Sequence, residues 1–517
     1  MSNTAYQNPI ISGFYPDPSI CRVGEDYYLV TSSFEYFPGV PIFHSRDLVN
    51  WEQIGHCLTR DSQIPLQNAK SSGGIFAPTI RHNNGLFYMV TTNTTGGGHF
   101  FVSAKNAAGP WSEPIWITLP GIDPSCFFDD NGKVYFTSTM GNGRDRQGIG
   151  QCQIDLTTGE RLSEQKMIWQ GTGGSFPEGP HMIKVDGRYY LMIAEGGTAT
   201  GHMITVARAD NPWGPFAACP HNPILSHRHL RGWAPIQATG HGDMVQAHDG
   251  TWWIVFLGTR QYGRTPYFHQ LGRETFLGPV SWSDEGWPVV NDGRPIECDM
   301  PAPGLPAFPV AKAPVRDDFE TADLAFCWNF LRNPRPADWS LSERPGWLTL
   351  HGSEVSLDEA DSPAFVARRQ QHFECEATVC VEFDPIGDHE EAGLTVIMNE
   401  QHHYEIAIVR HEGQRHVAFK RRIGSMANVE AMRPLPPGPV QLRISAMPNS
   451  YAFSCAVPGG EFEVLGEGEA RYLSSEVAGG FTGVYVGMYA TGNGKRCQAP
   501  AQFDWFDYEG TNAPLPK

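Results

Sequence analysis

Four polar side chains stand at matched positions in the sequence and could share one site. Five aromatic-rich segments recur along the chain, and counting back twelve residues from the second aromatic of each, or eleven in the first, reaches Asp17, Phe76, Asp123, Glu178 and His241. Three carboxylates that converge on one place shift each other's pKa values or need a balancing cation. Such a group can cleave a glycosidic bond, because one carboxyl stays protonated to serve the leaving oxygen while an ionised one activates water. A third carboxylate nearby can keep the acid protonated by repulsion.

Each of these positions also has a plainer interpretation when it is taken alone. Pro-Asp-Pro-Ser at 16–19, Ile-Asp-Pro-Ser at 122–125 and Pro-Glu-Gly-Pro at 177–180 are all ordinary turn sequences. A hydrogen-bonded core histidine explains His241 as well as a metal or water ligand does. The sequence has no HExxH motif and no Cys/His zinc spacing. The catalytic interpretation therefore depends on the shared register across the repeats.

The five segments predict the fold that would bring these side chains together. Their second aromatics are spaced by 60, 47, 55 and 63 residues, intervals of the size of a propeller blade, at Tyr28, Tyr88, Tyr135, Tyr190 and Trp253. Four segments follow an Asn-Gly or Asp-Gly pair, so each is expected to be the second strand of a hairpin. In a propeller the innermost strands surround a central channel. We therefore expect a five-bladed β-propeller with the polar side chains at its axis.

The composition favours an all-β chain and excludes several function classes. Of 517 residues 56 are Gly and 41 are Pro, and aromatic residues make up 12%, which suits short strands and tight turns. The net charge of −18 disfavours nucleic acid and membrane surfaces as partners, and no apolar stretch has the length of a membrane span. The eleven cysteines include no C-x-x-C pair, and no signal-like segment opens the sequence. We expect reduced thiols and a cytoplasmic location.

A Pro-rich stretch follows the last repeat and divides the chain. Residues 1–300 are expected to form the propeller and residues 301–314 an extended linker. Alternating polar and apolar residues at 404–410 and 440–446 predict half-buried strands beyond the linker. We expect residues 315–517 to form a C-terminal β-sandwich.

Several motifs together resemble glycoside hydrolase family 43, in its two-domain β-xylosidase and α-L-arabinofuranosidase branch. The resemblance covers nearly the whole chain. The motifs are Tyr-Pro-Asp-Pro-Ser at 15–19, Ser-Ser-Phe-Glu-Tyr-Phe-Pro-Gly at 32–39, Ser-Gly-Gly-Ile-Phe-Ala-Pro at 72–78, Gly-Ile-Asp-Pro-Ser at 121–125, Pro-Glu-Gly-Pro at 177–180, Gly-His-Gly at 240–242 and Leu-Gly-Arg-Glu-Thr at 271–275. The resemblance implies an inverting mechanism with Asp17 as general base and Glu178 as general acid. It implies that Asp123 raises the pKa of the acid and orients it.

The resemblance also implies residues around the substrate. Arg273 corresponds to an arginine that pairs with the base and holds substrate hydroxyls, and Phe34 to an aromatic wall of the non-reducing subsite. Phe76 stands where related β-xylosidases often carry Trp, a departure that bears on the choice of sugar. In such relatives a loop of the sandwich closes the pocket, which points to Phe481. No cofactor is required for the chemistry, and the resemblance allows a calcium ion or a water molecule on the propeller axis near His241.

The function expected first is that of an exo-acting β-xylosidase, which releases xylose from the non-reducing end of β-1,4-xylo-oligosaccharides. An α-L-arabinofuranosidase, or an enzyme with both activities on arabinoxylo-oligosaccharides, is the alternative. A non-catalytic carbohydrate-binding propeller would need only aromatic platforms and hydrogen bonds, and a structural propeller predicts no preference for acids on the axis. The resemblance leaves room for a homo-oligomer, although the sequence shows no interface.

Overall fold

The chain folds almost entirely into β-strands, as expected. The computed structural model describes residues 5–141, 147–232, 234–263 and 266–511. Its helical segments are short: the 3-10 turns η1 (Asn291–Gly293) and η2 (Ala470–Leu473) and the helix α1 (Ser475–Ala478). Among the described residues, no helix has the length and apolar character needed to cross a membrane. All eleven cysteines are free thiols.

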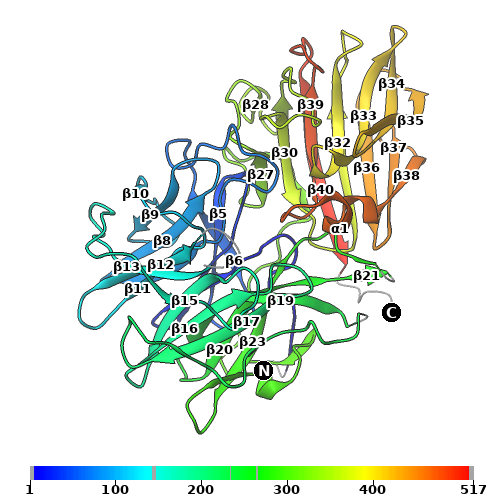
Figure 1. The fold of residues 1–517 in the computed structure, drawn as a ribbon. Coiled ribbons are helices and arrows are strands. Elements are labelled where there is room, and N and C mark those ends of the chain that lie inside the picture. The colour runs from blue at the N-terminus through cyan, green and yellow to red at the C-terminus, as the bar shows by residue number, and fades with distance from the viewer. Residues whose placement is uncertain (1–4, 142–146, 233, 264–265, 512–517) are drawn as a thin grey trace.

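The first part of the chain is a five-bladed β-propeller (Figure 1), so the prediction from the repeats is confirmed. Each blade is a sheet of four antiparallel strands. In chain order the blades contain β2 (Ser19–Val23), β3 (Asp26–Val30), β5 (Gly39–Ser45) and β6 (Glu52–Leu58); β7 (Thr79–Asn83), β8 (Leu86–Asn93), β9 (Gly98–Ala104) and β10 (Ile115–Ile117); β11 (Ser125–Phe128), β12 (Val134–Met140), β13 (Gly148–Gln153) and β14 (Lys166–Trp169); β15 (Glu178–Val185), β16 (Arg188–Glu195), β17 (Met203–Ala209) and β18 (Ala217–Ala218); and β19 (Ile236–Gln246), β20 (Trp252–Arg260), β23 (Glu274–Trp282) and β24 (Pro288–Val290).

The first strand of each blade lies next to the first strand of the following blade, and β19 closes the ring against β2. Each marker aromatic lies in the second strand, as the hairpin prediction requires. The tight turns have the expected backbone: Asn84-Gly85 and Asp186-Gly187 both have positive φ at their two central residues. Asn and Asp tolerate this conformation and Gly adopts it freely, so the turn matches the twist of the hairpin.

The second part is a β-sandwich of two eight-stranded sheets. One sheet contains β28 (Trp339–Ser340), β29 (Leu348–Leu350), β40 (Ala501–Thr511), β31 (Glu374–Glu382), β36 (Val440–Met447), β37 (Ser450–Ala456) and β38 (Glu463–Glu469), with β26 (Arg316–Asp317) paired to β40. The other contains β35 (Met426–Pro434), β34 (Gln414–Ile423), β33 (His402–His411), β32 (Glu391–Asn399), β39 (Tyr485–Thr491), β30 (Ala364–Arg369), β27 (Trp328–Leu331) and β4 (Tyr36–Phe37).

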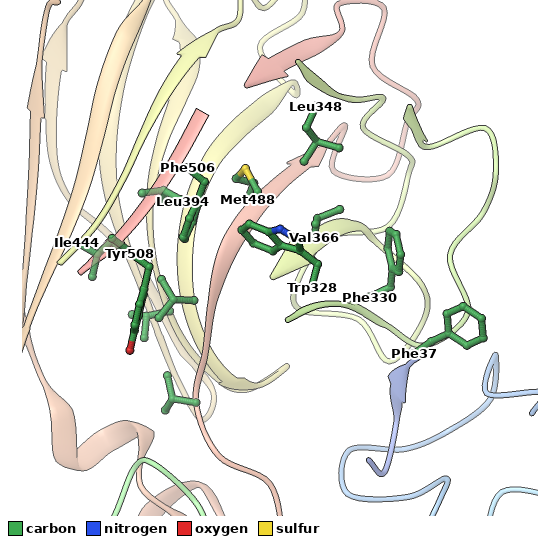
Figure 2. Packing of buried hydrophobic residues seen from close by; sticks show 14 of the residues in the cluster. Phe37, Trp328, Phe330, Leu348, Val366, Leu394, Ile444, Met488, Phe506 and Tyr508 are labelled. Carbon is green, nitrogen blue, oxygen red and sulfur yellow. The ribbon is translucent and has the colours of Figure 1, made fainter. Parts of the chain in front are cut away.

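Two strand pairs tie distant parts of the chain together. Strand β4 comes from the first blade's sequence but pairs with β27, which places Phe37 opposite Phe330 in the sandwich sheet. Figure 2 shows Phe37 beside Phe330 at one end of the sandwich core. Strand β1 (Ala5–Gln7) pairs with β25 (Asp299–Pro301), so the start of the chain is fixed to the end of the propeller.

The remaining strands form a small hairpin of β21 (Tyr262–Gly263) and β22 (Tyr267–Phe268). Between β25 and β26 the chain has no helix or strand, which suits a linker. The division of the chain at 301–314 stays a prediction, and the pairing of β4 with β27 means that the two parts share one sheet.

Candidate active site

The three carboxylates singled out by the repeats lie at the same end of the innermost strands. Asp17 and Asp123 each precede an innermost strand by two residues, and Glu178 is the first residue of β15. Asp17 and Asp123 are buried, and both have a φ of 55°. Positive φ is uncommon outside glycine and concentrates at functional sites, because the surroundings must impose it. His241, in β19, shares this backbone conformation with a φ of 44°.

Asp17 is held as an ionised carboxylate. Ser32 Oγ donates to its Oδ2 at 2.6 Å and Arg273 Nη1 to its Oδ1 at 3.0 Å, while His241 Nδ1 lies 3.6 Å from the same Oδ1. Burial alone would raise the pKa of Asp17, but Arg273, His241 and the Ser32 hydrogen bond together outweigh burial and lower it. A carboxylate with a low pKa can accept a proton from water across a wide pH range.

The pKa values of Asp123 and Glu178 are raised, in contrast with that of Asp17. Burial raises the pKa of Asp123 well above its usual value, and repulsion from Glu178 and Asp17 raises it further. Burial and repulsion from Asp17 raise the pKa of Glu178 to about 7, although Arg273 opposes the shift. Because Asp123 and Glu178 repel each other, this pair keeps a proton at pH values where isolated carboxyl groups have lost theirs. The site thus holds a proton donor beside an ionised acceptor.

Three phenylalanine rings from distant segments form a wall beside these groups. Ring centroids are 5.2 Å apart for Phe34 and Phe76, 6.1 Å for Phe34 and Phe481, and 6.2 Å for Phe76 and Phe481. Phe34 is buried and Phe76 is half-buried, whereas Phe481 is 40% exposed. The guanidinium of Arg273 lies 5.7 Å from the centroid of Phe34 and 5.6 Å from that of Phe481. An apolar wall with a cationic group at its edge suits a sugar ring with hydroxyls on its rim.

The sandwich contributes directly to this site. Phe481 lies between α1 and β39, and its backbone N–H donates to Ser72 Oγ at 2.8 Å. Its carbonyl accepts from Arg273 Nη2 at 3.3 Å. The loop expected to reach the pocket therefore lies against the propeller, and Phe481 is brought to Phe34 and Phe76 as the resemblance implied.

Sequence reasoning missed the residues that orient the arginine and the base. Arg273 Nη1 also donates to Thr198 Oγ1 at 3.0 Å, and Ser32 binds Asp17. His202 is buried, and its Nδ1 lies 3.2 Å from the carbonyl of Ala238. None of these residues stands at the register of the repeat, so the repeat gave no signal for them.

A second layer of polar groups lies on the axis beneath the first. Asp243 accepts from Ser19 Oγ at 2.7 Å and from Arg81 Nη1 at 2.7 Å, and Arg81 Nη2 lies 3.0 Å from His181 Nδ1. Asp243 follows His241 by two residues and Ser19 follows Asp17 by two, so one offset from the repeated position reaches both residues. That shared offset could have identified both residues from the sequence.

The described side chains of the axis do not by themselves form a calcium site, and the ion that the resemblance allows stays a prediction. Calcium takes six to eight oxygen ligands, whereas the oxygens of Asp17 are already bound by Ser32 and Arg273. The guanidinium of Arg81 supplies a fixed positive charge to Asp243. His241 packs under Gly179, where an added Cβ would meet its ring at 2.9 Å. In the part of the chain that the structure describes, no group of three or more His, Cys, Asp or Glu side chains could hold a metal.

Comparison with known proteins agrees with this geometry. Residues 6–288 match the family model of glycosyl hydrolases family 43, and residues 316–509 match that of the beta xylosidase C-terminal Concanavalin A-like domain. A non-reducing end alpha-L-arabinofuranosidase of Bacteroides ovatus is 44% identical over 98% of this chain and 95% of its own length. A xylosidase/arabinosidase of Butyrivibrio fibrisolvens is 38% identical over 97% of this chain and 99% of its own.

Solved structures agree as well. The Bacteroides ovatus protein described as xyloglucan PUL GH43B superimposes with a TM-score of 0.94 at 43% identity, over 98% of this chain and 100% of that one. The likeness therefore spans both the propeller and the sandwich.

Proposed function

Because the chain belongs to glycosyl hydrolases family 43, we propose that it is an exo-acting, inverting glycosidase that releases single pentose units from the non-reducing ends of oligosaccharides containing xylose or arabinose. The unequal protonation of Asp17 and Glu178 carries this proposal. Hydrolysis with inversion needs one carboxylate to accept a proton and one carboxylic acid to donate one at the same time. The low pKa of Asp17 and the pKa of about 7 of Glu178 supply both near neutral pH.

In the proposed reaction, Asp17 accepts a proton from water as the water oxygen bonds to the anomeric carbon. Glu178 gives its proton to the glycosidic oxygen as the bond from that oxygen to the anomeric carbon breaks. Water attacks the face opposite the leaving group, so the released sugar has the inverted anomeric configuration. Asp123 assists by keeping Glu178 protonated until the reaction begins.

Arg273 is assigned to the substrate hydroxyls. Its Nη1 holds Asp17 and Thr198, while its buried Nε has no hydrogen-bond partner among the described residues. An unpartnered guanidinium N–H is costly in a buried position, and a sugar hydroxyl would satisfy it. This arrangement would also fix the sugar relative to the base.

The exo-acting mode is supported by the covering of one side of the site. The rings of Phe34, Phe76 and Phe481 form a continuous wall, and the bond of Phe481 to Ser72 fastens the sandwich loop over it. We expect a site covered on one side in this way to take a terminal sugar and not a chain that continues in both directions. No cofactor has a part in the proposed chemistry.

Between the two sugars, we place α-L-arabinofuranose first and β-D-xylopyranose second. The relative at 44% identity is named an arabinofuranosidase, and the one at 38% carries both names. This ranking differs from the one expected from the motifs, in which xylose came first. Both activities are compatible with the wall, because apolar contacts discriminate between similar sugars by only about 1–3 kcal/mol.

The test is hydrolysis of p-nitrophenyl α-L-arabinofuranoside, p-nitrophenyl β-D-xylopyranoside and xylobiose, with Glu178→Gln as the inactive control. Faster cleavage of the arabinoside supports the ranking, and faster cleavage of both xylosides reverses it. NMR of the first sugar released reports the anomeric configuration. Retention would refute the assignment of Asp17 as a base, and no turnover of any substrate would refute the proposal as a whole.

A further inference from the structure

One aromatic side chain beside the acid has no part in the site described above. Phe176 precedes Glu178 by two residues, in the connection between β14 and β15, and it is 56% exposed. Its φ is 52°, in the left-handed region that a bulky side chain rarely adopts. Such a conformation persists only where the surrounding structure enforces it. Burial in the core does not explain this conformation, because the ring is exposed.

The support of Phe176 is rigid. Glu195, fully buried at the end of β16, accepts hydrogen bonds from the backbone N–H of Thr172 at 3.0 Å and that of Gly174 at 2.9 Å. The hydroxyl of Thr205 donates to the same carboxylate at 2.5 Å. Gly196 N–H donates to the carbonyl of Ser175 at 2.7 Å. These hydrogen bonds hold residues 172–175 against the fourth blade. The backbone that carries Phe176 is therefore fixed, while its side chain stays exposed.

The ring lies at the rim of the active site. A Cβ added to Gly197 would lie 3.4 and 3.8 Å from two carbons of the Phe176 ring, so the ring rests against this glycine. The next residue, Thr198, accepts from Arg273, which in turn holds Asp17. Phe176 is therefore close to the reacting groups, on the side of the acid.

That side is where the leaving group must lie. The acid donates its proton to the glycosidic oxygen, so the leaving group, which is the rest of the oligosaccharide, lies next to Glu178. The terminal pentose, which water attacks, lies deeper in the site. The glycone wall of Phe34, Phe76 and Phe481 comes from the first two blades and the sandwich, not from the connection that carries Phe176. The two aromatic surfaces belong to different subsites.

We propose that Phe176 is the platform of the leaving-group subsite, on which the apolar face of the second sugar ring of the substrate packs. The inference rests on the proposed function, because it needs Glu178 to be the acid. A ring held in place before the substrate arrives loses little entropy on binding, and it adds contact area only for substrates that have a second ring.

The experiment compares two substrates that share the same pentose and differ in the leaving group. Xylobiose has a sugar as its leaving group, whereas β-D-xylopyranosyl fluoride has a fluoride ion, which is too small to reach Phe176. The corresponding arabinofuranosides replace both if the enzyme prefers arabinose. Phe176→Asn removes the ring and keeps a residue that tolerates positive φ. Phe176→Tyr keeps the ring, and Phe326→Asn changes a phenylalanine of similar exposure, 52%, in the sandwich part.

Phe176→Asn is expected to lower kcat/KM about tenfold for the disaccharide and less than about twofold for the fluoride. Phe176→Tyr and Phe326→Asn are expected to leave both values unchanged, and Phe176→Asn should not lower the Tm. An equal loss on both substrates, or no loss on either, would overturn the assignment of Phe176. Failure of the unaltered protein to cleave either substrate would instead overturn the proposed function.

Discussion

Among the described residues, one buried group of charges lies on the propeller axis and another lies in the sandwich. In the sandwich, Lys420 Nζ lies 2.8 Å from both Glu391 and Glu405, and His403 Nδ1 lies 2.9 Å from Glu405. Burial opposes ionisation, but Lys420 and His403 outweigh it and lower the pKa of Glu405. The carboxylates of Asp358 and Glu405 overcome burial and raise the pKa of His403 to about 9. Glu405, His403 and Lys420 are thus stabilised in their charged forms.

In the layer of the axis that holds Asp17, Asp123 and Glu178, the carboxylates lie near one arginine. Among the described residues Arg273 forms an ion pair with Asp17 and not with the other two, and the pKa values of Asp123 and Glu178 rise. Balanced charges fix the positions of side chains, whereas uncompensated like charges cost stability and hold a proton ready for transfer. The comparison indicates why we propose the chemistry for the axis and not for the sandwich cluster.

The largest expected effect is a loss of kcat when the ionised carboxylate on the axis is removed. Asp17→Asn keeps the size of the side chain but cannot accept a proton from water, so kcat should fall about 10³-fold. The measurement is turnover of the better p-nitrophenyl substrate, with the Tm as a control for folding. A decrease below about tenfold in a folded variant would show that Asp17 is not the base.

The second effect breaks the balanced cluster. Lys420→Met leaves Glu391 and Glu405 buried without their cation, which should cost about 2–3 kcal/mol of unfolding free energy, less than for a fully buried pair because the lysine side chain is 28% exposed. Urea unfolding measures this loss, while kcat should not change. Arg433→Met, which removes an exposed ion pair with Glu463, is the matched control and should cost less than about 1 kcal/mol. Equal losses in the two variants would contradict the comparison.

The third substitution is expected to raise the free energy of unfolding, whereas the second lowers it. The pKa of Glu178 is raised from 4.5 to about 7 in the folded chain, so the folded state binds this proton more tightly and loses stability as the pH rises between these values. Glu178→Gln removes that loss and should be about 1–2 kcal/mol more stable than the unaltered protein at pH 8, but not at pH 4. Unfolding in urea at both pH values tests the prediction. A variant that is less stable at pH 8 would show that the axis is not strained by repulsion.

The fourth effect concerns the pH profile. Activity needs Glu178 protonated, so kcat/KM should fall as the pH rises through about 7. Asp123 and Glu178 repel each other when both are ionised, so Asp123→Asn removes that repulsion and should move this basic limb down by about one pH unit. An unchanged basic limb would mean that Asp123 acts only by orienting its neighbours.

The smallest effect is expected from removal of metal ions. Because Arg81 already balances Asp243 on the axis, EDTA should leave kcat unchanged and the Tm within about 1 °C. A loss of several degrees that calcium reverses would identify a bound ion that the donor groups on the axis do not explain.

Much of the axis could be predicted from the sequence. The repeat fixes the depth of each innermost strand, so the common register identifies Asp17, Asp123, Glu178 and His241 from the sequence. Hairpin turns such as Asn84-Gly85 fixed the second strands because their chemistry is local. Arg81 was not found, because nothing in the spacing of the repeat shows which side chain of the second blade turns to Asp243.

The aromatic surfaces depended on tertiary structure. Only the family resemblance pointed to Phe481, whose bond to Ser72 joins residues 409 positions apart. The pairing of β4 with β27 makes one sheet of segments that the composition assigns to separate parts. Phe176 lies in an irregular connection between two strands. The sequence has no periodicity there from which the direction of its side chain could be predicted.

The sequence by itself determined the repeat, the strands and the carboxylates on the axis, since these follow from local turn chemistry and a fixed period along the chain. Only the tertiary structure decided which carboxylate keeps a proton and which rings lie together beside the carboxylates. A pKa is set by burial and by charges from other blades, and a wall is set by the docking of one part on the other. Both depend on distances between residues that the order of the sequence does not contain.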